Sequence, residues 1–385
     1  MRLAVGDTER RIASSVREFA AGLGETVPRA EAAGSIPPEV IAGLARLGLL
    51  GITVPERDGG LGASTAAFAL ALEELAAAWP ALSVAVSVNS GIVARSIVAL
   101  GTPAQRAAWL PRLMDGRGLG AFCLTEPSSG SDAASLRATA RPDGDGYVID
   151  GTKLFITNAR YAPLFIVLAR VGERDVSRAH AGITAFVVPA GAPGLTVGPG
   201  EKKLGLLASD TSSVILEGVR VGQDAVLGEV GRGFSQVAMA GLDGGRIGIA
   251  AQAVGIARGA LDRAAAYAKE RRQFGRPIAS FESMRFAFAQ ARTDLEAARL
   301  LVLRAAALRD AGRPHTREAS EAKLFASEAA NRICHFAVQA LGGYGYVRAF
   351  GVERQARDAR ATTIYEGTSE IQRLVIARSL LGEAA

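Results

Sequence analysis

The sequence predicts an α+β protein of three consecutive domains: an N-terminal all-α domain over residues 1–118, a middle antiparallel β-barrel or sandwich over 119–228, and a C-terminal four-helix bundle over 229–385. Apolar residues recur at helical spacing in the first third, and the middle third contains short β-rich runs separated by Gly and Pro. The last third returns to long helical segments. A chain of 385 residues is also expected to divide into more than one core.

In the first third, apolar residues with the 4-3-4 spacing of one helical face predict a helix after Asp7. These residues are Ile12, Val16, Phe19 and Leu23. Further helices are expected at about 37–47 and 106–114, and another after Ser64, because serine favours the N-cap position.

The middle third predicts several short strands with no helix between them, which favours an antiparallel barrel or sandwich. Residues 147–149 and 154–157 are β-rich and flank Asp150-Gly151, a pair that takes the positive φ of a tight turn, so a hairpin is expected there. Further strands are expected at 164–169, 183–188 and 213–216.

The last third predicts long helices separated by Pro277 and Pro314, one of them over about 281–311, as in an antiparallel bundle. Ser369 and Gln372 have capping-box spacing, so a final helix is expected to begin there. The same pattern predicts a buried face made of Ile371, Leu374 and Val375. Glu366 would then lie on the loop just before this helix.

Composition and charge narrow the class of protein. Hydrophobic residues make up 49% of the chain, and the net charge is +6. Basic residues are mixed with acidic ones and no Lys/Arg run is interleaved with aromatics, which weighs against nucleic-acid binding. The apolar stretch 234–256 is interrupted by Asp243 and Arg246, so it predicts a core helix and no membrane insertion. With no secretory h-region and no disulfide framework from its two cysteines, the chain is expected in the cytoplasm.

Several catalytic motifs are absent from the sequence. There is no GxGxxG, GxxxxGK[ST], HExxH or GxSxG, so the usual signals for a dinucleotide-binding βαβ unit, a P-loop or a serine hydrolase are missing. The three histidines, His180, His315 and His335, are far apart in sequence, and no metal site is expected.

Four segments carry chemical signals, and each has a structural alternative when taken alone. The loop 122–132 contains Ser, Thr and Gly residues that suit a polar ligand, although a domain boundary would also explain it. The strand 153–158 ends in two side-chain hydrogen-bonders. The segment 271–277 places cations at a helix C-terminus, where the helix dipole favours them. The last segment combines the Gly-rich 339–345 with 364–372, where Gly367 permits close approach to a ligand.

Together and in this order, the four segments resemble the signature regions of the acyl-CoA dehydrogenase family over nearly the whole chain. Short-chain, butyryl-like members look most similar, judging from residues 87–89 and 242–248. The resemblance implies FAD-dependent oxidation of the Cα–Cβ bond of an acyl-CoA, with a short or branched acyl chain, to a trans-2-enoyl-CoA. Glu366 would abstract the α-proton, and a hydride would pass to flavin N5.

The resemblance also implies further site residues. Cofactor contacts would be Phe122, Leu124, Thr125, Ser131, Phe155, Thr157, Arg271, Phe274, Gln339, Gly343, Thr368 and Glu370. Substrate contacts would be Ser131, Asp243, Arg246, Tyr365 and Gly367, with an acyl pocket between residues 82 and 97. Four of the cofactor contacts match residues that reach the FAD of a neighbouring subunit, which implies a homotetramer. They are Arg271, Phe274, Gln339 and Gly343. Electron-transfer flavoprotein would accept the electrons.

Three alternatives stay open at this stage. A same-fold oxidase or monooxygenase would use O2, a carrier-protein-linked acyl group would replace acyl-CoA, and a scaffold protein would keep the fold without activity. The intact Tyr365-Glu366-Gly367 segment favours dehydrogenation, because monooxygenase relatives generally lack the carboxylate. Burial would raise the pKa of Glu366 and the adjacent helix N-terminus would lower it, and the sequence leaves that balance open.

Overall fold

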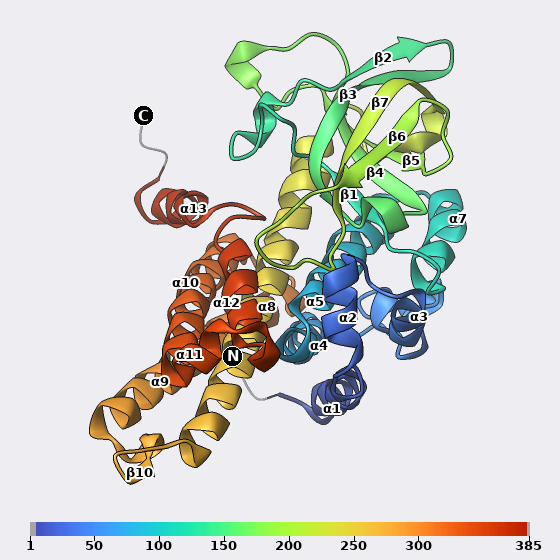
Figure 1. The fold of residues 1–385 in the computed structure, drawn as a ribbon. Coiled ribbons are helices and arrows are strands. Elements are labelled where there is room, and N and C mark those ends of the chain that lie inside the picture. Colours follow the sequence, from blue (N-terminus) through green and yellow to red (C-terminus); the bar gives the residue numbers. More distant parts are fainter. Residues whose placement is uncertain (1–4, 383–385) are drawn as a thin grey trace.

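A computed structural model describes residues 5–382 and shows a helical part, a β-sheet part and a second helical part in chain order (Figure 1). This architecture confirms the predicted fold class. The sheet lies at one end of the molecule. The long helix α8 (Ala240–Glu270) starts beneath the sheet and runs to the β9–β10 hairpin at the opposite end (Figure 1).

The N-terminal part contains the predicted helices. Their bounds are α1 Asp7–Ala21, α2 Thr26–Ala33, α3 Pro38–Arg46, α4 Thr65–Ala78, α5 Pro80–Val86, α6 Arg95–Leu100 and α7 Pro103–Met114. The Ser64 hydroxyl accepts a hydrogen bond from the Ala67 N–H at 3.1 Å, which confirms the predicted N-cap of α4. A π-helical turn over Ser87–Ala94 joins α5 to α6. The helical stretch Pro80–Leu100 is long and apolar enough to cross a membrane, but 89% of its apolar window is buried inside the protein, as in a core helix.

The middle part is one eight-stranded sheet with the order β6-β7-β3-β2-β4-β5-β8, and β1 pairs with β4. The strands are β1 Ala121–Cys123, β2 Thr139–Asp143, β3 Gly146–Thr157, β4 Leu164–Arg170, β5 Ile183–Pro189, β6 Leu195–Gly200, β7 Thr211–Gly222 and β8 Val226–Leu227. Most neighbours are antiparallel, as predicted, whereas β4 pairs in parallel with both β1 and β2.

The predicted hairpin at Asp150-Gly151 is wrong. Strand β3 runs straight through these residues, and the turn lies instead at residues 144–145, between β2 and β3. Gly151 has a φ of 147° at a register shift between β3 and β7, so its conformational freedom serves a bulge rather than a turn. The Asp150 carboxylate accepts the Gly218 N–H at 2.7 Å and thereby ties the bulge to β7.

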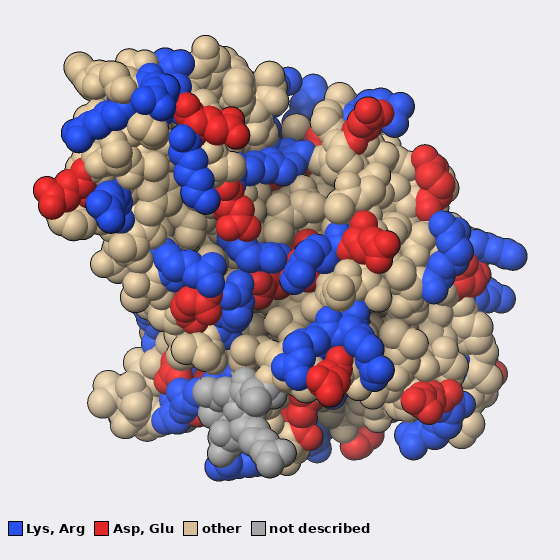
Figure 2. All heavy atoms as spheres, turned by 90° about the horizontal axis from the view of Figure 1, so that it is seen from below, with Lys and Arg blue, Asp and Glu red and all other residues tan. Residues whose placement is uncertain are grey.

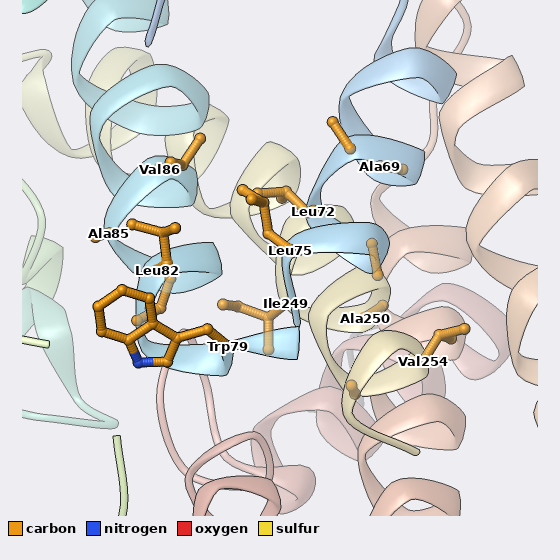
Figure 3. Packing of buried hydrophobic residues seen from close by; sticks show 14 of the residues in the cluster. Ala69, Leu72, Leu75, Trp79, Leu82, Ala85, Val86, Ile249, Ala250 and Val254 are labelled. Atoms are coloured by element: carbon orange, nitrogen blue, oxygen red, sulfur yellow. The ribbon is translucent and has the colours of Figure 1, made fainter. Parts of the chain in front are cut away.

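The C-terminal part is built on α8, α9 (Glu282–Asp310) and α10 (Thr316–Leu341), followed by α11 (Gly343–Tyr346), α12 (Val352–Ala361) and α13 (Ser369–Leu381). Helix α9 confirms the helix expected over 281–311. The core continues across the two helical parts: Leu72, Leu75 and Leu82 lie around Ile249 of α8 and belong to the same buried cluster (Figure 3). The N-cap of α13 is Thr368 rather than Ser369, because the Thr368 hydroxyl accepts the Ile371 N–H.

The surface carries mixed charges. In the view from below, basic and acidic side chains alternate, and no single sign dominates that face (Figure 2). This distribution agrees with the mixing of basic and acidic residues along the sequence.

Asp358 of α12 is a fully buried carboxyl group that fastens a loop of the middle part to the bundle. It accepts the Leu206 N–H at 2.5 Å, and Glu31 of α2 accepts the next N–H, that of Leu207, at 3.1 Å. Burial, followed by the nearby charge of Glu31, raises the pKa of Asp358 from 3.8 to about 7. The folded protein therefore holds this proton more tightly than the unfolded chain does.

We predict that Asp358→Asn removes a pH-dependent loss of stability. Because the pKa of Asp358 is raised in the folded protein, its protonated form contributes to the free energy of unfolding. This contribution is fully present below pH 4 and is lost as the pH rises to about 7. Between these values the free energy of unfolding of the wild type should fall relative to the variant, by about 4 kcal/mol at most. Urea unfolding at pH 4, 5.5 and 7.5 measures the difference. A constant difference across this range would contradict the assignment.

Candidate active site

A cavity of about 560 Å³ lies where the sheet meets the bundle. Its walls come from the segment after β1, from the end of β3, from the start of α8 and from the loop before α13. Ten of the predicted residues meet here: Phe122, Leu124, Thr125, Ser131, Phe155, Thr157, Arg246, Tyr365, Glu366 and Gly367. Val88 and Ile92, within the segment expected to form the acyl pocket, line it as well.

Glu366 occupies an unusual backbone position in this wall. Its φ is 52°, in the left-handed region that non-glycine residues rarely adopt, and Gly367 follows with φ 91°. Its N–H donates to no acceptor among the described residues. The carboxylate oxygen Oε2 is buried and likewise lacks a hydrogen-bond partner within residues 5–382. A strained backbone that presents one unpaired donor and one unpaired acceptor to a cavity is typical of a reactive site.

Gly245 of α8 makes the space for this carboxylate. A Cβ atom built at position 245 would lie 2.0 Å from Oε2 of Glu366, far inside van der Waals contact. Any larger residue at 245 would therefore displace the carboxylate from its place.

The electrostatics of the cavity favour a carboxyl group that titrates near neutrality. Burial raises the pKa of Glu366 to about 7, and the charges of Lys323 and then Arg246 work in the opposite direction. Burial therefore outweighs the two nearby cations, and the pKa of Glu366 is raised overall. The Arg246 guanidinium donates a hydrogen bond to Oδ1 of Asp243 at 2.7 Å, which holds Arg246 in place. Asp243 does not line the cavity but positions a residue that does.

A buried ion pair fixes the loop 122–132 in place. The Lys153 amine donates to Glu126 Oε1 at 2.7 Å and to the Leu124 carbonyl at 3.2 Å, and both charged side chains are buried. Glu126 also accepts the N–H groups of Arg137 and Ala138. These contacts leave the other face of the loop, with Thr125, free to line the cavity.

Phe155 and Thr157 connect this cavity to a second one of about 300 Å³. Tyr365 also lines both, and its hydroxyl donates to the Gln252 amide oxygen. Phe155 has a φ of 57° and is 59% exposed, which is unusual for a large aromatic residue. An exposed aromatic ring beside two adjoining spaces suits a planar ring system.

Six predicted cofactor contacts lie outside this cavity. Thr368 and Glu370 are at the start of α13, beside it. Arg271, Phe274, Gln339 and Gly343 are not among the cavity's residues, and they surround the β9–β10 hairpin and the end of α10, at the far end of the bundle from the sheet (Figure 1). Phe274 is 92% exposed there. One chain therefore does not bring the two groups together.

Other cavity residues were missed by the sequence. They include Phe234, Met239, Leu242 and Arg378. Ile371, Leu374 and Val375 line the cavity rather than forming a buried face, and Leu374 is 52% exposed. Their apolar spacing is typical of a core helix, but a helix that borders a binding cavity has the same spacing. Lys323, which contacts the Glu366 segment, carried no sequence signal of its own, and the signal of Gln372 was the spacing of a capping box.

Comparisons with known proteins agree with this geometry. The acyl-CoA dehydrogenase N-terminal domain matches residues 6–117, the middle domain 121–219 and the C-terminal domain 231–381. A short-chain specific acyl-CoA dehydrogenase of Bos taurus mitochondria is 47% identical over 345 residues, covering 90% of this chain and 83% of the relative. A caffeyl-CoA reductase-Etf complex subunit of Acetobacterium woodii is 42% identical, covering 93% of each chain.

A solved structure gives the same result. Butyryl-CoA dehydrogenase from Megasphaera elsdenii superposes with a TM-score of 0.95 at 40% identity, covering 99% of this chain and 100% of that one. The chain therefore belongs to the acyl-CoA dehydrogenase family and is a flavin-dependent acyl-CoA dehydrogenase.

Proposed function

We propose that the flavin is FAD, that the substrate is a short-chain acyl-CoA and that Glu366 is the base. The observation that carries the proposal is the Glu366 carboxylate, whose Oε2 is buried and unpaired within the described residues, in the wall of a cavity that the 122–132 loop also lines. A base must face its substrate without being occupied by a protein partner.

The chain's own residues divide the reaction between them. The Glu366 carboxylate takes the α-proton, and its backbone N–H, which has no acceptor within the described part of the chain, is available to the thioester oxygen. Such a donor stabilises the negative charge that develops on that oxygen as the proton leaves. Bound FAD supplies the acceptor for the hydride that leaves Cβ, so that the substrate loses one proton and one hydride in all.

The residues present fit a flavin. The two cavities that meet at Phe155 and Thr157 offer an aromatic face and a hydroxyl group at the end of β3. The fixed loop 122–132 adds Thr125 and Ser131 on the neighbouring wall. Phe122 and Leu124 would hold the cofactor from the same loop.

A short acyl chain is supported by the inner wall of the cavity. Val88 and Ile92 come from the π-helical turn, which packs against α8 near Gly241. These aliphatic side chains give the cavity an apolar wall, which suits an acyl chain. The similarity to short-chain and butyryl-CoA dehydrogenases supports the same chain length. Dehydrogenation is favoured over the oxygen-using and carrier-linked alternatives for the same reason.

A homotetramer and an electron-transfer flavoprotein partner complete the proposal. The exposed Arg271 and Phe274 would contact the FAD of a neighbouring subunit, because they lie away from the cavity of their own chain. The relative named as part of a complex with Etf supports that partner as electron acceptor. The cytoplasm remains the proposed location.

We predict that Glu366→Gln retains FAD and slows substrate-driven flavin reduction at least about 10³-fold, because the amide cannot accept the α-proton. Anaerobic mixing with butyryl-CoA, followed by flavin absorbance, measures the rate. Reduction at the wild-type rate would show that another group is the base.

The wild-type rate should depend on pH through the same carboxyl group. Since Glu366 must be ionised to act and its pKa is about 7, the rate should rise about tenfold per pH unit below 7 and level off above it. The pH profile of kcat/KM from 5 to 8 tests this expectation. A flat profile would mean that the base ionises well below neutrality.

Gly245→Ala should slow flavin reduction about 10²-fold without loss of FAD, because the new methyl group displaces the Glu366 carboxylate. Gly241→Ala, one helical turn away, is the control, since a Cβ there has its nearest neighbour at an ordinary 3.4 Å. Equal rates for the two variants would argue against a fixed position of the carboxylate.

A further inference from the structure

Lys323 of α10 contacts the Glu366 segment but belongs to none of the site residues assigned above. Its side chain is fully buried, and its amine donates to the Gly367 carbonyl at 2.6 Å. A buried lysine is costly unless a partner compensates its charge. Lys323 makes no ion pair with any residue from 5 to 382, and its one hydrogen-bond acceptor is a neutral carbonyl.

Lys323 shares its acceptor with Gln372 of α13. The Gln372 amide donates to the Gly367 carbonyl at 2.9 Å and to the Glu366 carbonyl at 3.3 Å. Helices α10 and α13 therefore both hold the backbone on the C-terminal side of Glu366. Glu366 and Gly367 both have a positive φ there. These contacts fix a strained conformation that the segment would not keep by itself.

The charges around Glu366 come from three elements. Arg246 on α8 is paired with Asp243, so part of its charge is compensated. Lys323 on α10 has no such partner, although Glu328 and Glu370 lie near enough to act on it. Tyr365 is bound to Gln252 and stays neutral, since burial raises its pKa. Burial lowers the pKa of Lys323 to about 8, which leaves the ammonium charged at neutral pH.

We infer that Lys323 is a positioning residue for the reaction: it holds the backbone that presents Glu366 and supplies a positive charge that favours the ionised form of the carboxylate. The inference rests on Glu366 being the base. A catalytic base needs a fixed position and an ionised carboxylate, and the Lys323 side chain contributes to both.

Two substitutions separate these tasks. Lys323→Met removes both the charge and the hydrogen bond, whereas Lys323→Gln removes the charge and keeps a donor for the Gly367 carbonyl. Lys202→Met, at an exposed lysine, is the control for the substitution itself. FAD content and thermal unfolding establish that each holoenzyme is folded.

The experiment is the pH profile of flavin reduction by butyryl-CoA, from pH 5.5 to 9.5, in these variants, the wild type and Glu366→Gln. Without the charge, the acid limb should move upward by about one pH unit, so both Lys323 variants should be about tenfold slower at pH 6. Both should recover at pH 9, Lys323→Gln more fully because it keeps the hydrogen bond.

The outcomes separate this inference from the proposed function. An acid limb that coincides with the wild type in both Lys323 variants, while Glu366→Gln is slow, would overturn the role of Lys323 alone. Wild-type reduction by Glu366→Gln would overturn the base assignment and, with it, the role of Lys323. A rate loss that is equal at every pH would leave only a structural effect and would also overturn the inference.

Discussion

The structure of the site depends on one constraint: a carboxylate must be buried beside its substrate and still be able to ionise. Raising the pKa of Glu366 from 4.5 to about 7 corresponds to roughly 3 kcal/mol against the charged form. The bundle limits this cost with two cations, Lys323 and Arg246, and it makes room for the carboxylate with Gly245. Because α8 supplies both Gly245 and Arg246, and α10 supplies Lys323, the contact between these two helices determines the chemistry.

The opposite wall of the cavity follows a similar logic. The loop 122–132 must direct its polar groups toward a ligand, and it is therefore held from behind by the buried pair Lys153 and Glu126. Phe155 presents its ring from a strained backbone, as Glu366 presents its carboxylate. In both walls, rigid elements stabilise an unfavourable backbone conformation at the surface of the cavity.

The sequence predicted the fold class and most elements, because helical spacing and β-rich runs are local signals. The prediction from the sequence failed at Asp150-Gly151, because the same residue pair suits a tight turn and a β-bulge equally well. Only the pairing of β3 with β7 decides between the two. The cavity-lining residues implied by resemblance came together, whereas Lys323 could not be found. A lysine within a helix is usually solvated, and its burial depends on α8 and α13, which are remote in sequence.

The division of the predicted cofactor contacts has a physical consequence for assembly. Phe274 is 92% exposed at the hairpin, in a backbone conformation with φ 50°, and Tyr346 nearby along the bundle end is 84% exposed. Large aromatic residues that are exposed together at the tip of a molecule are typical of a surface that another molecule covers. If the cofactor site of a second copy covers them, each chain completes the cavity of its neighbour. The far end of the bundle is then as much a part of the active site as Glu366 is.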